Sequence, residues 1–189
     1  DDMSLSHLKQ LLQGDATLDG ITLDQDTRWN IIRQLNRYNF KGSEQLLRAE
    51  AKADQSDSGE KAALAAQVIR PDAAVKAEWL RRITDESAPY PKLRIAMNNL
   101  YPPEQAQLQR QTAAQRLQTL AEMDSTKGRV FMRTYAPNLI PQDCTQASVA
   151  DLQQAIKANP QLSTMTMRTL KEIAQGEQRC VLVSEKMTQ

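Results

Sequence analysis

Histidine, glycine and aromatic residues are scarce in this sequence, and each shortage excludes a kind of site. The single histidine, His7, is too few for the H-E-x-x-H site of a metallopeptidase, which needs two histidines on one helical face. The six glycines include no cluster that would cradle a phosphate group. Aromatic residues make up 4% of the chain, too little for rows of base-stacking side chains. We therefore expect no catalytic residues and no metal ligands in this chain.

Charge and hydropathy exclude two further classes of protein. The 24 basic and 23 acidic residues leave a net charge of +1, whereas nucleic-acid-binding proteins usually carry a basic excess or a basic stripe. No apolar run approaches the roughly 20 residues that cross a membrane, and no signal peptide opens the sequence. We expect no nucleic acid as a partner and no membrane span in this segment. The first residues read as the middle of something longer, so we expect a fragment of a larger polypeptide.

Helix-forming residues are abundant and are regularly interrupted by helix breakers. Ala, Leu, Gln, Arg, Lys and Glu are frequent, while runs of alternating β-branched residues are missing. Caps and prolines divide the chain into about ten helices joined by short loops, which favours αα-hairpins stacked side by side. The sequence therefore predicts a single all-α domain over residues 1–189. Its expected architecture is an irregular superhelical stack, similar to HEAT and armadillo solenoids.

Several helix boundaries are predicted in the second half of the chain. A long Gln-rich helix is expected over 104–123, and Asp124 is expected to cap the helix that follows it. Ser148 and Asp151 have the spacing of a capping box at the start of another helix. The last long helix is expected over 162–186.

The stretch LDQDTRW, residues 23–29, has the pattern of a helix entrance. A carboxylate from Asp24 or Asp26 would satisfy the free N–H groups of the first helical turn. Calcium binding is the weaker interpretation of these acids, because the spacing of a calcium loop and its closing glutamate are missing. Trp29 follows at once, and it and Trp79, in a later helix, are interpreted as wedges between helical layers.

A series of motifs then follows a recognisable order. The D-x-D-x-R-W entrance is formed by Asp24, Asp26, Arg28 and Trp29, and it is followed by the polar turn DQSDSGE and a Pro-Asp helix start before Trp79. Further on stand the segments LYPPEQAQLQRQTAAQRLQTL and ANPQLSTMTMRTLKEIAQGEQRCVL. Together these motifs resemble the C-terminal helical domain of zinc aminopeptidases of the aminopeptidase N family. The resemblance covers nearly the whole chain, but only the last part of the family's length.

This resemblance implies a function that depends on residues outside the chain. The zinc ligands and catalytic residues of the family belong to an upstream catalytic domain of the same polypeptide, so zinc is expected there and no cofactor here. The helical domain would cover the catalytic cleft and limit or guide the access of peptide substrates, with LDQDTRW as a structural hinge. The alternative is a free-standing helical-repeat module that holds a protein partner in its concave face. The true start of the open reading frame distinguishes the two.

Arg94 and Tyr101 are the candidate substrate contacts. They flank the short helix between two proline breaks, and loops after helices often carry binding residues. We expect them to contact the distal end of a peptide, the alternative being that both are ordinary surface residues.

The two cysteines, Cys144 and Cys180, are either buried thiols or one disulfide, and they are too few for a four-ligand zinc site. If the helices on either side of the Asn159-Pro160 turn are antiparallel, Cys144 is carried towards residues 178–182, so we expect the pair to be close enough to bond. A bond would indicate the bacterial periplasm or cell envelope, and free thiols would indicate the cytoplasm.

Overall fold

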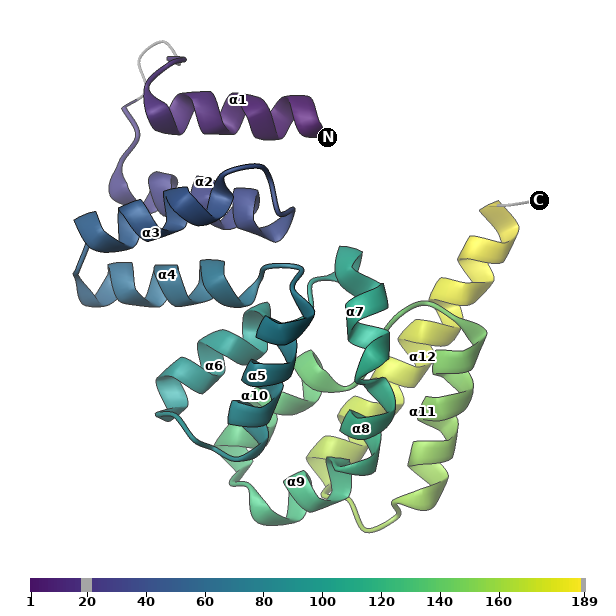
Figure 1. Cartoon of the computed structure of the whole chain (residues 1–189). Helices are drawn as coiled ribbons and strands as arrows, with labels where there is room; N and C mark the ends of the chain where they lie inside the picture. The colour runs from purple at the N-terminus through teal and green to yellow at the C-terminus, as the bar shows by residue number, and fades with distance from the viewer. Residues whose placement is uncertain (18–21, 188–189) are drawn as a thin grey trace. The chain divides into compact units, whose positions relative to one another are not determined.

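The computed structural model describes residues 1–17 and 22–187 of the chain (Figure 1). These residues form twelve α-helices and one short 3-10 helix, with no strand among them. The predicted all-α stack of helical hairpins is therefore confirmed. Two compact units can be distinguished, Asp1–Leu100 and Tyr101–Gln189, and each is described here by itself. Within the described ranges, no helix is both long and apolar enough to span a membrane.

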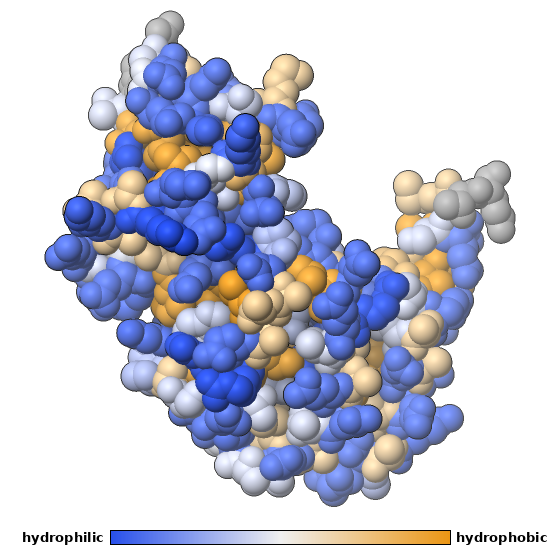
Figure 2. All heavy atoms as spheres, viewed as in Figure 1, coloured by the Kyte–Doolittle hydropathy of each residue, from blue (hydrophilic) through white to orange (hydrophobic). Residues whose placement is uncertain are grey.

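The first unit is built around one central helix. Its six helices are α1 (Asp2–Gln13), α2 (Gln25–Arg37), α3 (Ser43–Ala53), α4 (Asp57–Val68), α5 (Ala73–Thr84) and α6 (Tyr90–Asn99). The central helix, α4, contacts α2, α3, α5 and α6, while α1 packs on α2 (Figure 1). The core between α1 and α4 is apolar and contains Leu5, Leu12, Trp29, Ile31, Ile32, Leu35, Leu47 and Ala66. Most of the surface is hydrophilic, and hydrophobic side chains come to the surface between α1 and α2 (Figure 2).

Short polar side chains determine where these helices begin. Asp24 caps α2, because its Oδ1 accepts a hydrogen bond from the N–H of Thr27 at 2.7 Å. Asp26 lies in the first turn of α2, where its charge is favourable to the helix dipole, but it is not the capping residue. Ser56 caps α4 and Asp72 caps α5 in the same way as Asp24. The sequence therefore predicted the cap of α2 to within two alternatives, of which the first is right.

Gly59, in the first turn of α4, has a steric role. A Cβ atom built on it would lie 2.4 Å from Cγ of Asp54 and 2.6 Å from the main-chain oxygen of Asp54. The second of these atoms belongs to the backbone and cannot rotate away. The Asp54 carboxylate meanwhile accepts hydrogen bonds from Trp29 and from Ser56. A glycine at position 59 therefore lets the turn between α3 and α4 close over α2.

The second unit contains a helical hairpin with shorter helices packed on it. The elements are η1 (Pro103–Gln105), α7 (Ala106–Gln111), α8 (Ala113–Gln118), α9 (Leu120–Thr126), α10 (Arg129–Leu139), α11 (Gln146–Ala158) and α12 (Thr164–Met187). The hairpin is formed by α11 and α12, which lie side by side, and α10 packs on α12 (Figure 1). The most deeply buried apolar residues of the unit include Leu120, Leu139, Leu152 and Leu170.

The prediction of one continuous Gln-rich helix over 104–123 is wrong. The segment is broken into η1, α7, α8 and the start of α9. Thr112 and Thr119 stand at the breaks, and each hydroxyl donates to a carbonyl of the preceding turn, which competes with the helical hydrogen bonds. The buried Arg116 donates to the carbonyl of Gln109 and so links α8 back to α7.

Two predicted caps also differ from the structure. Asp124 lies inside α9 and braces the start of α12 instead, because its carboxylate accepts from the N–H and hydroxyl of Ser163 and from the hydroxyl of Thr166. The cap of α12 is Ser163, whose hydroxyl accepts from the N–H of Thr166. The cap of α11 is Thr145, whose hydroxyl accepts from the N–H of Ser148. Ser148 is therefore already inside the helix that it was expected to begin. In α11 the capping residue lies three positions before the expected one. Asp124 bonds to residues that are distant in the sequence instead of to the next helix.

The two helical glycines, Gly59 and Gly176, give a matched test of this packing. Gly59→Ala should lower the free energy of unfolding by about 1–3 kcal/mol, because the new methyl group overpacks the turn against the Asp54 backbone. Gly176→Ala should raise it by up to about 1 kcal/mol, because nothing lies within 4 Å of a Cβ there and alanine favours the helix. Urea unfolding of the 189-residue chain measures both. Equal effects of the two substitutions would contradict the steric role of Gly59.

Candidate functional site

The LDQDTRW motif forms an ion pair between α2 and α3. Arg28 reaches across to Glu50 in a bidentate arrangement, with Nε 2.7 Å from Oε1 and Nη2 2.6 Å from Oε2. Gln25 donates a third hydrogen bond to Oε1 of Glu50 at 2.8 Å. The Glu50 side chain is 8% exposed and that of Arg28 is 32% exposed, so the pair is shielded on the carboxylate side. This geometry is the strong, planar form of an arginine–carboxylate contact.

The hydrogen bonds from Arg28 hold the pKa of the Glu50 carboxyl below its usual range, although burial acts in the opposite direction. Glu50 in turn raises the pKa of the Arg28 guanidinium. A carboxyl whose pKa is lower in the folded state stabilises the fold above its unfolded-state pKa, and this contribution is lost as the pH falls through the folded-state pKa. The ion pair is therefore fully formed at neutral pH and weakens only in acid.

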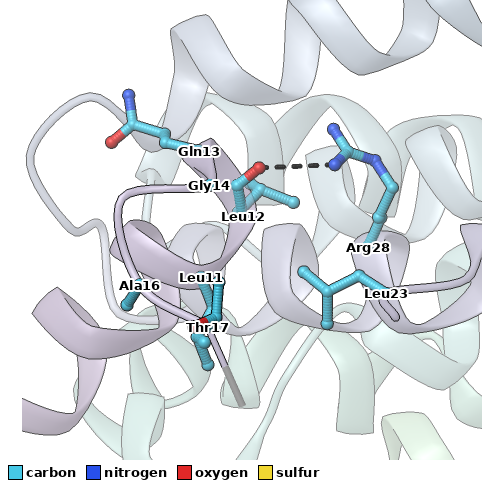
Figure 3. A pocket seen from close by; sticks show the side chains of 8 residues that line it. All are labelled: Leu11, Leu12, Gln13, Gly14, Ala16, Thr17, Leu23 and Arg28. Atoms are coloured by element: carbon cyan, nitrogen blue, oxygen red, sulfur yellow. Dashed lines mark hydrogen bonds between the residues drawn. The ribbon is translucent and has the colours of Figure 1, made fainter. Parts of the chain in front are cut away.

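A surface pocket of about 360 Å³ opens beside this ion pair (Figure 3). Arg28 borders it and donates from Nη1 to the main-chain oxygen of Leu12 at 3.3 Å, which ties α2 to the end of α1. The described residues of the lining are Leu11, Leu12, Gln13, Gly14, Ala16, Thr17, Leu23 and Arg28. None of these eight is a histidine, a cysteine or a carboxylate. Arg28, the one charged group among them, is already paired with Glu50, so these eight described residues offer no acid–base pair and no activated nucleophile.

Trp29 is the second contact of the motif. Its indole is 5% exposed, and Nε1 donates to Oδ2 of Asp54 at 2.8 Å. Hydrogen bonds from the Ser56 hydroxyl and from Trp29 hold the pKa of the Asp54 carboxyl below its usual range. Trp79 of α5 is also buried, at 6% exposure, and the guanidinium of Arg82 lies 5.0 Å from the centre of its ring. Both tryptophans are buried, as expected for wedges between helices, and this role stays a prediction.

The proposed substrate contacts, Arg94 and Tyr101, lie in different compact units. Arg94 is an exposed residue of α6. Tyr101 is half-buried, its hydroxyl is hydrogen-bonded to that of Thr112 at 2.7 Å, and the Arg116 guanidinium lies 4.4 Å from its ring centre. Tyr101 is therefore held in place from two sides. Peptide binding by this pair stays a prediction.

Arg116 is a buried residue that sequence reasoning did not identify. It is 1% exposed, and its two terminal nitrogens donate to the carbonyls of Leu139 at 2.7 Å and Gln109 at 2.6 Å. Burial lowers the pKa of Arg116 from its usual value and raises that of Tyr135. No pattern marks a buried arginine in advance, because its carbonyl partners come from backbone turns that any residue can supply. Arg116 organises the second unit and is not accessible for catalysis.

The remaining ligand-type residues do not form a metal centre. Among the residues that the structure describes, no group of three or more histidines, cysteines, aspartates or glutamates is placed to hold a metal ion. His7 is exposed on α1. Cys144 and Cys180 are joined to each other, with their Cα atoms 5.4 Å apart, so neither sulfur is free to bind a metal.

Comparison with known proteins gives the relationship of the chain. The family model of the ERAP1-like C-terminal domain matches residues 1–179. Aminopeptidase N of Streptomyces lividans is 24% identical over 179 residues, which is 94% of this chain but 21% of that protein. The chain thus spans about one fifth of the length of this relative. Since the match covers nearly the whole sequence, the resemblance to aminopeptidase N is confirmed, and the chain belongs to the family of ERAP1-like C-terminal domains.

Proposed function

We propose that this chain is the C-terminal helical domain of a zinc aminopeptidase, where it covers the catalytic cleft and limits or guides the access of peptides. The observation that carries the proposal is the family match over residues 1–179. It is supported by the relationship to an aminopeptidase N over a stretch that is 21% of that relative's length. The remaining length of that relative would accommodate a separate catalytic domain, which the proposal places upstream on the same polypeptide.

The described residues do not fit a zinc site, which supports a division of roles between the two parts. A catalytic zinc takes three protein ligands and a water molecule, and the described part of the chain brings no three ligand-type residues together. In the proposed enzyme, zinc would activate the attacking water in the upstream domain. No step of the chemistry is assigned to this chain. Its own residues would contribute shape and peptide contacts.

Removing the domain tests this proposal. In the full-length enzyme, the segment that corresponds to this chain is deleted. The ratio of kcat/KM for long peptides to kcat/KM for an aminoacyl arylamide should then change by roughly tenfold or more, because only long peptides reach the helical domain. Zinc content and circular dichroism of the truncated enzyme verify that its catalytic part is folded. The isolated chain, added back in trans, serves as the second control. An unchanged ratio between long and short substrates in a folded, zinc-loaded enzyme would contradict the proposed role.

The proposed contacts, Arg94 and Tyr101, allow a finer test. Arg94→Ala together with Tyr101→Ala should raise KM about threefold or more for long peptides and leave it unchanged for dipeptides, because distal contacts add to the binding of long peptides only. Arg133→Ala with Tyr38→Ala, both exposed residues, is the matched control. Tyr101→Ala also removes the ring beside Arg116, so the unfolding midpoint is measured too, and Arg94→Ala alone separates binding from stability. Equal KM values across peptide lengths would exclude both residues.

A further inference from the structure

The connection between α10 and α11 is fastened to α12 at two points one helical turn apart. The first is Glu177, 6% exposed, whose Oε2 accepts hydrogen bonds from the N–H groups of Asp143 at 2.8 Å and Cys144 at 2.7 Å. The second is the disulfide from Cys144 to Cys180, three residues further along α12. Residues three apart lie on the same face of a helix. One loop is therefore held by a charge-assisted contact and a covalent bond on the same face of α12.

The disulfide stands at the border between the packed and the unpacked part of α12. Val181 is 5% exposed and is the last buried residue of the helix, whereas residues 182–187 are all exposed. Hydrophobic side chains are visible on these last turns in Figure 2, and they include Leu182, Val183 and Met187. Cys180 itself is exposed and Cys144 is half-buried. A thiol from solution can therefore reach the bond at Cys180 without the unit unfolding.

The loop has further attachments that do not depend on the disulfide. The main chain of Gln142 exchanges two hydrogen bonds with the side chain of Gln109. The carboxylate of Asp143 accepts from Nε of Arg110 at 2.7 Å and from the hydroxyl of Thr145 at 2.6 Å. Cys144 has a φ angle of 58°, a left-handed conformation that is unfavourable for a residue with a Cβ and that persists only where its surroundings impose it. With Glu177, these contacts fix the loop even when the sulfur–sulfur bond is broken.

We propose that the Cys144–Cys180 bond is a thiol–disulfide exchange site, open to a small dithiol or to a dithiol protein while the chain stays folded. The thiolate of the reductant attacks Sγ of the exposed Cys180, the bond to Cys144 breaks, and Cys144 leaves as a thiolate that takes up a proton. The second thiol of the reductant then attacks its own sulfur in the mixed disulfide and releases Cys180. The dithiol becomes a disulfide, and two electrons and two protons pass to the two cysteines.

Reduction of the disulfide should loosen only the end of α12, because the Glu177 contact does not depend on the disulfide. Without the disulfide, the last turns of α12 from Cys180 onward lose their covalent link to the loop. They keep the buried Val181 and two exposed polar contacts, from Ser184 to Cys144 and from Gln146 to Glu185. Glu177 continues to bind the N–H groups of Asp143 and Cys144. The hairpin of α11 and α12 keeps its buried residues, such as Leu152 and Leu170. This inference rests on the loop and α12 alone and is independent of the proposed aminopeptidase role.

Hydrogen exchange with thiol mapping tests the site in the intact polypeptide that carries this chain. A dithiol such as dithiothreitol should reduce the bond at a rate proportional to its concentration, with unchanged circular dichroism. Amides of 180–187 should then exchange roughly tenfold faster, while those of 148–176 keep their protection. A reduction rate that is independent of the dithiol concentration and equal to the rate of global unfolding would overturn the proposal. Faster exchange throughout 148–176 would overturn it as well.

Matched variants separate the two attachments. Cys144→Ser with Cys180→Ser should reproduce the exchange pattern of the reduced protein. In the reduced protein, Glu177→Gln should accelerate amide exchange at 142–145 about tenfold. In the oxidised protein the exchange rate should stay within about twofold of that of the unsubstituted protein, because the disulfide still holds the loop. Glu172→Gln, an exposed glutamate on the same helix, is the control and should change neither. Equal acceleration by Glu177→Gln in both redox states would show that the disulfide is not a second attachment.

Discussion

The first unit depends on the ion pair between Arg28 of α2 and Glu50 of α3. The carboxylate is nearly buried and is stable there only because three hydrogen bonds reach it, two from Arg28 and one from Gln25. The next residue on α2, Trp29, is bonded to Asp54 at the end of α3, and Gly59 leaves the space that this turn needs. Two consecutive side chains thus position α3 and the start of α4, which in turn is the centre of the unit.

Features that depend on neighbouring residues could be predicted from the sequence, whereas features that depend on distant partners could not. The cap by Asp24 is local, because its donor is three residues away. The Arg116 bond to Leu139 joins residues 23 apart, and the bond from Ser163 to Asp124 joins residues 39 apart. A carboxylate has the same chemistry whether its donors lie in the next turn or in a distant segment, so the sequence alone favours the nearer helix for Asp124. The approach of Cys144 to Cys180 was accessible because the hairpin turn between them is visible in the sequence.

The buried polar groups of the described chain contribute to its packing. Arg116, Glu50 and Glu177 are all buried, and each forms hydrogen bonds with backbone groups or with an opposite charge. Active sites instead hold titratable groups with open positions towards a substrate. In the proposed enzyme, the exposed residues that meet a peptide would depend on how this domain is placed against the catalytic one. The expectation that Arg94 and Tyr101 flank a short helix is only partly met, because Arg94 lies inside α6 and Tyr101 follows its end.

The central claim is that the LDQDTRW motif is structural, and a double-mutant cycle on Arg28 and Glu50 in the full-length protein tests it most directly. Arg28→Met alone should lower the free energy of unfolding by roughly 2–3 kcal/mol, because it leaves the nearly buried Glu50 carboxylate without its opposite charge. The double variant with Glu50→Met should recover much of this loss. In the proposed aminopeptidase, turnover of a short substrate should be unchanged in the folded double variant. A double variant with wild-type stability and lost turnover would contradict the claim and assign the motif to chemistry.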